Sequence, residues 1–124
     1  MAHRLDIIAQ QVVRIKVREY KYTMDGEHTG YLYLKDGQKH QCMWLSMKKG
    51  LYTSWHGDWF MVQGKLRAEF DCRGDLKKCK VKWANVDLTT GRGVDDDEST
   101  ITMQLTRQCH FDPATASYCE GPSE

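Results

Sequence analysis

Residue types that perform acid–base or nucleophilic chemistry recur at two-residue spacing in two places along this chain. His40 and Cys42 form one group, and Ser54, His56 and Asp58 form the other. Such residues can supply a nucleophile with its base, or ligands for a metal ion. On a strand, however, positions i and i+2 share a face but seldom reach the geometry that proton abstraction needs. We therefore keep an enzyme or metal-site protein centred on His40, Cys42 and His56 as an alternative function only.

The motifs that usually identify catalytic or nucleotide-binding proteins are missing from the sequence. It contains no Gly-x-Ser-x-Gly elbow, no phosphate-binding glycine loop and no paired Cys-x-x-Cys knuckle. Asp95-x-Asp97-x-Ser99 is similar to the opening of a calcium loop but lacks the glycine and glutamate that should follow. We accordingly expect no catalytic residues, no metal and no cofactor.

Aromatic residues are concentrated in the middle of the chain. The candidate set consists of Trp44, Tyr52, Trp55, Trp59 and Phe60. Rings of this size fill the core of a small domain, or line a pocket for an apolar or sugar-like ligand. The preferred hypothesis is a non-catalytic binding or interaction module. It would use this aromatic surface to contact a protein or a small apolar or sugar-like ligand, by burying an aromatic anchor.

Basic residues occupy every second position in two segments, so each row is expected on one face of a strand. The two rows consist of Arg14, Lys16, Arg18, Lys78, Lys80 and Lys82. If they were neighbours, they would form a positive surface for RNA or another polyanion. The formal net charge is only +1, so this second alternative depends on charge segregation in space.

The elements that must position these side chains are strands, because apolar and polar residues alternate with a period of two. The expected strands span residues 13–22, 31–34, 40–47, 51–55, 59–62, 66–70, 78–83 and 100–106. Glycine-bearing turns such as Asp36-Gly37 separate them at short intervals. We predict an all-β fold: a small curled antiparallel meander of about eight strands, with at most a short N-terminal helical turn. A barrel and a two-layer sandwich both satisfy this pattern.

The 124 residues suffice for one domain. We expect a single β domain over residues 1–108 and a loosely structured C-terminal tail over residues 109–124. The predicted core consists of Val13, Ile15, Val17, Leu32, Leu34, Trp44, Trp59, Met61, Leu66, Phe70, Val81, Trp83, Ile101, Met103 and Leu105.

The five cysteines are an odd number at irregular spacing, which is untypical of a secreted disulfide framework. Buried thiols are the main expectation, and pairing of Cys72 with Cys79 or of Cys109 with Cys119 is a secondary one. The start of the chain carries no signal-peptide pattern and no apolar run is long enough to cross a bilayer. These features predict an intracellular, cytoplasmic protein without membrane insertion, and leave its oligomeric state open.

Overall fold

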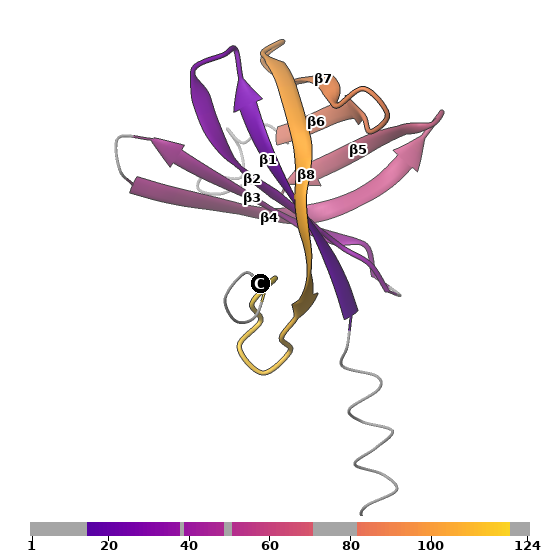
Figure 1. The fold of residues 1–124 in the computed structure, drawn as a ribbon. Helices are drawn as coiled ribbons and strands as arrows, with labels where there is room; N and C mark the ends of the chain where they lie inside the picture. Colours follow the sequence, from indigo (N-terminus) through magenta and orange to yellow (C-terminus); the bar gives the residue numbers. More distant parts are fainter. Residues whose placement is uncertain (1–14, 38, 49–50, 71–81, 120–124) are drawn as a thin grey trace, which may run out of the picture.

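Two-residue alternation produces strands throughout the part of the chain that the structure, a computed structural model, describes: residues 15–37, 39–48, 51–70 and 82–119. The strands are β1 (Ile15–Met24), β2 (His28–Lys35), β3 (Gln41–Lys48), β4 (Leu51–Val62), β5 (Lys65–Phe70), β6 (Lys82–Asp87), β7 (Arg92–Asp95) and β8 (Thr100–Phe111). Each strand pairs with the next in antiparallel fashion, and β8 pairs back with β1 (Figure 1). The predicted all-β meander is therefore confirmed, and it closes into an eight-stranded barrel.

The seam between β1 and β8 contains a register shift. Ladder pairs run from Ile15 with Phe111 to Met24 with Ile101, and the shift falls between Glu19 and Tyr20 of β1. One residue of β8 is thereby left without a partner, as in a β-bulge. Along its whole length β1 turns its odd-numbered side chains outward and its even-numbered ones inward. In β8 the side chains on the inner face change at the shift from odd-numbered to even-numbered.

The barrel has two distinct ends. The turns 25–27 and 96–99 lie together at the end that we call the upper end (Figure 1). The backbone and side chain of Asp25 both bond to Thr100, at 2.8 Å each, and tie these two turns together. At the lower end β1 begins, and the residues after β8 fold back beside it (Figure 1).

Three strands differ from the predicted ones. The segments 51–55 and 59–62 belong to one strand, β4, and β7 forms within a segment expected to be a loop. Gly57 lies inside β4, at a point where β5 comes very close. A Cβ atom at this position would clash with the carbonyl of Glu69 on β5. Glycine at this site permits close approach of the two strands and not a reversal of the chain. The strand expected at 78–83 runs from Lys82 to Asp87 in the described residues.

The interior of the barrel is filled by side chains from all parts of the ring. Its main cluster includes nine aliphatic or sulfur-containing residues and five aromatic ones: Tyr20, Tyr22, Leu32, Leu34, Cys42, Trp44, Trp59, Leu66, Ala68, Phe70, Ala84, Val86, Ile101 and Met103. Burial is confirmed for most of the predicted core, namely Val17, Leu32, Leu34, Trp44, Trp59, Leu66, Phe70, Ile101 and Met103. Ile15 is only half-buried, and Val13 and Val81 lie outside the described residues.

Besides Ile15, three predicted core residues are not buried. Met61 is 49% exposed beside the β4–β5 turn. Leu105 is 45% exposed, because β7 is short and its ladder with β8 ends at Thr102. Trp83 is half-buried on the outer face, since the pairing of Phe70 with Lys82 turns Lys82 inward instead.

A second apolar cluster lies outside the barrel, on its lower half. Val17 packs there with Tyr33, Cys109 and Tyr118, the last of which comes from the segment after β8.

Cys109 and Cys119 form a disulfide, which is the pairing that we gave as a secondary expectation. Cys42 is buried inside the barrel as predicted, and Cys72 and Cys79 lie outside the described residues. Strand β8 itself continues to Phe111, beyond the tail boundary that we expected at residue 108.

Glu19 anchors the seam next to this outer cluster. Its carboxylate accepts hydrogen bonds from the Thr106 hydroxyl at 2.7 Å and from Arg107 Nε at 3.2 Å. Burial by itself raises the pKa of Glu19, but the hydrogen bonds outweigh burial and leave the pKa below its ordinary value. The ionised form therefore stabilises the closed seam.

Replacing Gly57 by alanine is expected to lower the free energy of unfolding by about 1–3 kcal/mol, because the added methyl group forces β4 away from β5. Urea denaturation measures the change. Thr53→Ala, at an exposed position of the same strand, is the control and should change stability by less than about 0.5 kcal/mol. Equal stability of Gly57→Ala and the wild type would contradict the close approach.

Glu19→Gln should destabilise the protein at neutral pH and progressively less in acid. A carboxyl whose pKa is lowered on folding stabilises the native state above its unfolded pKa, here 4.5, and loses this contribution as the pH falls through the folded pKa. Urea denaturation of wild type and variant across this range tests the expectation. Glu27→Gln, in the exposed β1–β2 turn, should follow the wild type at every pH. A Glu19→Gln deficit that does not depend on pH would contradict it.

Candidate functional site

A cavity of about 230 Å³ lies at the upper end of the barrel. It is lined by residues of β1, β2, β3, β4 and β6: Tyr22, Met24, His28, Trp44, Ser46, Trp55 and Lys82. We call it the mouth cavity. Trp44 and Trp55 are register partners on neighbouring strands, so their side chains share one face of the sheet. Trp44 belongs to the interior cluster, and both side chains therefore turn toward the barrel axis.

Trp44 forms the rigid floor of the mouth cavity. Its ring is 2% exposed and lies 4.5 Å from the Tyr22 ring and 5.4 Å from Phe70, which meets it edge-on. The indole Nε1 donates to the Tyr22 hydroxyl, so its polar atom is satisfied inside the barrel. Burial raises the pKa of Tyr22, which keeps this hydroxyl protonated. Trp55, by contrast, is only half-buried and presents part of its ring at the cavity.

Lys82 brings a positive charge to the cavity wall. Its ammonium lies 5.7 Å from the Trp44 ring centre and pairs with the carboxylates of Asp95 at 3.5 Å and Asp96 at 3.6 Å. Asp95 is 1% exposed and also accepts hydrogen bonds from two backbone amides of its own turn, at 3.0 and 2.9 Å. Two carboxylates thus pair with one ammonium, although neither carboxylate lines the cavity itself.

The same carboxylates belong to the only cluster of potential metal ligands among the described residues, Asp95 with Asp96 and Asp97. The Lys82 ammonium already forms ion pairs with two of its members. The backbone amides that bond to Asp95 show that the cluster stabilises the β7–β8 turn. These contacts give the acidic run a structural explanation.

The predicted aromatic site is divided among several places. Trp44 and Trp55 meet in the mouth cavity, whereas Trp59 lies at the lower end, stacked on His40 at 4.3 Å. Phe60 is 40% exposed on the outer face of β4, and the side chain of Tyr52 lies outside the described residues. The sequence did not indicate the other residues of the cavity: Tyr22, Met24, His28 and Ser46. Tyr22 and Met24 continue the alternation of β1, which is the one signal that places them on the inner face.

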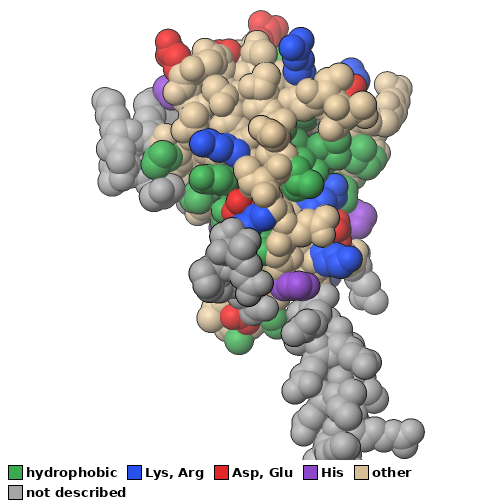
Figure 2. All heavy atoms as spheres, viewed as in Figure 1, with side chains coloured by type: hydrophobic (Ala, Val, Ile, Leu, Met, Phe, Trp, Pro, Cys, Tyr) green, Lys and Arg blue, Asp and Glu red, His purple; other side chains and the backbone are tan. Residues whose placement is uncertain are grey.

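The basic rows do not combine into one surface in the described residues. Arg18 lies at the lower end, bonded to Asp36 at 3.3 Å and 5.3 Å from the Trp59 ring, whereas Lys82 lies at the mouth. Lys16 is exposed, and Arg14, Lys78 and Lys80 lie outside the described residues. On the face shown in Figure 2, basic side chains are scattered, several of them beside acidic ones.

The residues of the enzyme or metal alternative are likewise separated. Cys42 is buried in the barrel interior, and His56 is exposed on the outer face of β4. His40 precedes β3 and packs flat against Trp59. A barrel wall therefore stands between the thiol and the His56 imidazole.

Comparisons of the chain with protein-family models, with curated proteins and with solved structures found no significant match. Among the described residues, no helix has the length and apolar character needed to cross a membrane. The geometry of the barrel is therefore the basis for any functional proposal.

Proposed function

We propose that this protein is a non-catalytic binding protein that takes a small, largely apolar ligand into the mouth cavity. The observation that carries the proposal is the register pair Trp44 and Trp55, both of which line the mouth cavity. Trp44 is held by Tyr22 and Phe70, so the floor of the cavity is formed before a ligand arrives. Such preorganisation lowers the entropic cost of binding.

The size of the cavity limits the ligand. Pockets for drug-sized molecules enclose about 300–1,000 Å³, and the mouth cavity is smaller, at about 230 Å³. It suits one or two rings, or a single apolar side chain of a partner protein. Contact with the half-buried Trp55 ring would remove apolar surface from water and supply most of the affinity.

Charge further restricts the ligand. Asp95 and Asp96 lie beside the cavity without lining it and already pair with Lys82, so its ammonium has little attraction left for an anionic ligand. His28 and Ser46 at the rim offer hydrogen-bonding groups for a neutral polar substituent. The favoured ligand is therefore a neutral ring system carrying one polar group.

The neutral two-ring fluorescent probe 6-propionyl-2-(dimethylamino)naphthalene, which carries one carbonyl group, tests this proposal. Its emission should rise on binding to the wild-type chain, and Trp55→Ala should weaken its affinity by about tenfold, because ring stacking and apolar burial are both lost. Trp83→Ala is the matched control, since Trp83 is a half-buried tryptophan on the outer face. It should bind the probe like the wild type.

Two results would refute the proposal. One is the absence of any increase in emission with wild-type protein. The other is an equal loss of affinity in the Trp55→Ala and Trp83→Ala variants, which would place the probe elsewhere. Tighter binding of the anionic two-ring compound naphthalene-2-sulfonate than of the neutral probe, measured by displacement of that probe, would overturn the charge argument.

A further inference from the structure

A second and larger cavity, of about 370 Å³, lies on the outside of the barrel at its lower half. It is lined by three residues of β4, one of β3 and three from the end of β8 and the segment after it: His56, Gly57, Asp58, Gln41, Phe111, Ala116 and Tyr118. We call it the outer groove. None of these residues lines the mouth cavity, so the outer groove is a separate site.

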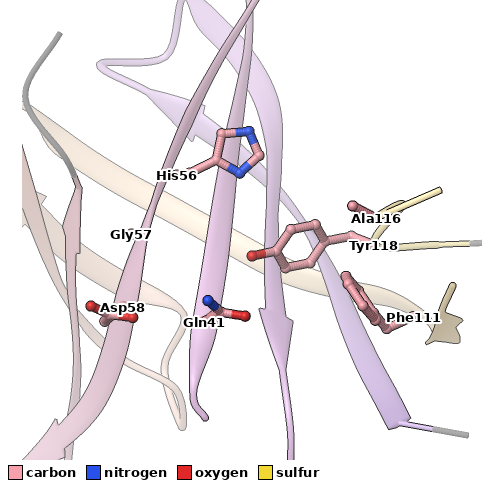
Figure 3. Close-up of a pocket in the computed structure, with 7 residues that line it drawn as sticks. All are labelled: Gln41, His56, Gly57, Asp58, Phe111, Ala116 and Tyr118. Atoms are coloured by element: carbon pink, nitrogen blue, oxygen red, sulfur yellow. The ribbon is translucent and has the colours of Figure 1, made fainter. Parts of the chain in front are cut away.

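One wall of the outer groove is polar. His56 and Asp58 share a face of β4 because they are two residues apart, and Gln41 is the register partner of Asp58 on β3 (Figure 3). The Gln41 side-chain oxygen accepts a hydrogen bond from the Lys35 ammonium at 2.8 Å, which fixes the orientation of the amide. Its NH₂ group remains a hydrogen-bond donor and lies on the β4 side of the amide (Figure 3). This wall therefore offers both hydrogen-bond donors and acceptors.

The opposite wall is aromatic. The Phe111 and Tyr118 rings meet edge to face at 5.7 Å, and Tyr118 directs its hydroxyl toward β4 (Figure 3). The Lys35 ammonium lies 4.0 Å from the Phe111 ring centre and holds that ring in place. Tyr118 is 8% exposed, and burial raises its pKa, so its hydroxyl stays protonated as a donor.

The segment that forms this wall is fastened to the barrel. The disulfide joins Cys119 to Cys109 of β8, and the backbones of Asp112 and Ser117 bond to each other at 2.9 and 3.2 Å. Tyr118 packs in addition on Tyr33 of β2, with ring centres 6.2 Å apart. The aromatic wall is consequently held in place without a ligand.

The charges at the groove nearly balance. Asp58 is the one carboxylate among the lining residues, and the Lys35 ammonium lies beside Gln41 and Phe111. A site with a polar wall, an aromatic wall and little net charge fits a neutral ring with hydroxyl groups on its edge and C–H groups on its face. Anions and organic cations gain little from such a site.

We propose that the outer groove binds a neutral saccharide, with its hydroxyl groups bonded to Asp58, Gln41 and His56 and its apolar face against Phe111 and Tyr118. The volume of about 370 Å³ falls within the range typical of ligand pockets. The saccharide is either free or the end of a glycan chain, and both present the same chemistry to the groove.

Titration of the ¹⁵N-labelled full chain with D-glucose, D-galactose, D-mannose and N-acetyl-D-glucosamine, followed by amide chemical shifts, tests the proposal. At least one sugar should shift the amides of Gln41, Gly57 and Tyr118 in a saturable manner. Sorbitol, an open-chain polyol, controls for general solute effects. Methyl glycosides of the binding sugar distinguish the two sources, because the end of a glycan chain must be accepted with its anomeric oxygen substituted.

Asp58→Asn should raise the dissociation constant about tenfold, because a charge-assisted hydrogen bond is lost. Glu69→Gln is the matched control: Glu69 is the register partner of Asp58 on β5 but does not line the groove, and this variant should bind normally. Cys119→Ser should also weaken binding by releasing the aromatic wall.

Three results would overturn the proposal. The first is that no sugar shifts these amides more than sorbitol does. The second is that tetramethylammonium or acetate shifts them more than any sugar. The third is that the sugar shifts map to Tyr22, Ser46 and Trp55, which would move sugar binding to the mouth cavity and leave the outer groove without a ligand.

Discussion

The hydrogen-bonded seam between β1 and β8 is the constraint on which the rest of the structure depends. A sheet of eight strands that did not close would expose two unpaired edges, and both are removed when the first and last strands pair. Closure fixes which residues face inward, and it brings the upper turns together around the mouth cavity. The register shift beside Glu19 also aligns Val17 with Cys109 on the outside, where the second apolar cluster forms. Both candidate sites therefore depend on this single ladder.

Alternation along the chain was sufficient to predict the fold class, because a period of two is the same in any antiparallel sheet. It also identified most of the buried residues, such as Leu66, Phe70 and Ile101, whose neighbours are polar on both sides. It was less informative about which face is the inner one. Lys82 turns inward because Asp95 and Asp96 neutralise its charge, and these partners come from β7, a strand that the sequence did not indicate, and from the turn after it. Arg18 likewise points to the lower end of the barrel, where Asp36 and Trp59 accommodate it.

The candidate sites were harder to predict for a related reason. Proximity in the sequence suggested one aromatic surface, but the long strand β4 carries Trp55 and Trp59 to opposite ends of the barrel. The outer groove combines His56 and Asp58, which are two residues apart on β4, with Tyr118, which is distant in sequence. Only closure of the barrel and the disulfide between Cys109 and Cys119 bring these residues together. No local pattern contains such information.

Pairing of the first strand with the last has a consequence during synthesis of the chain. Strand β1 leaves the ribosome early, yet its partner β8 ends only at Phe111. Every contact across this seam joins residues that are far apart in sequence, so the entropy of closing a long loop must be overcome before the ring forms. Until then one edge of β1 is exposed to other nascent chains. The polar and basic residues of β1, among them Lys16 and Lys21, give this unpaired edge of β1 a charged character that discourages aggregation.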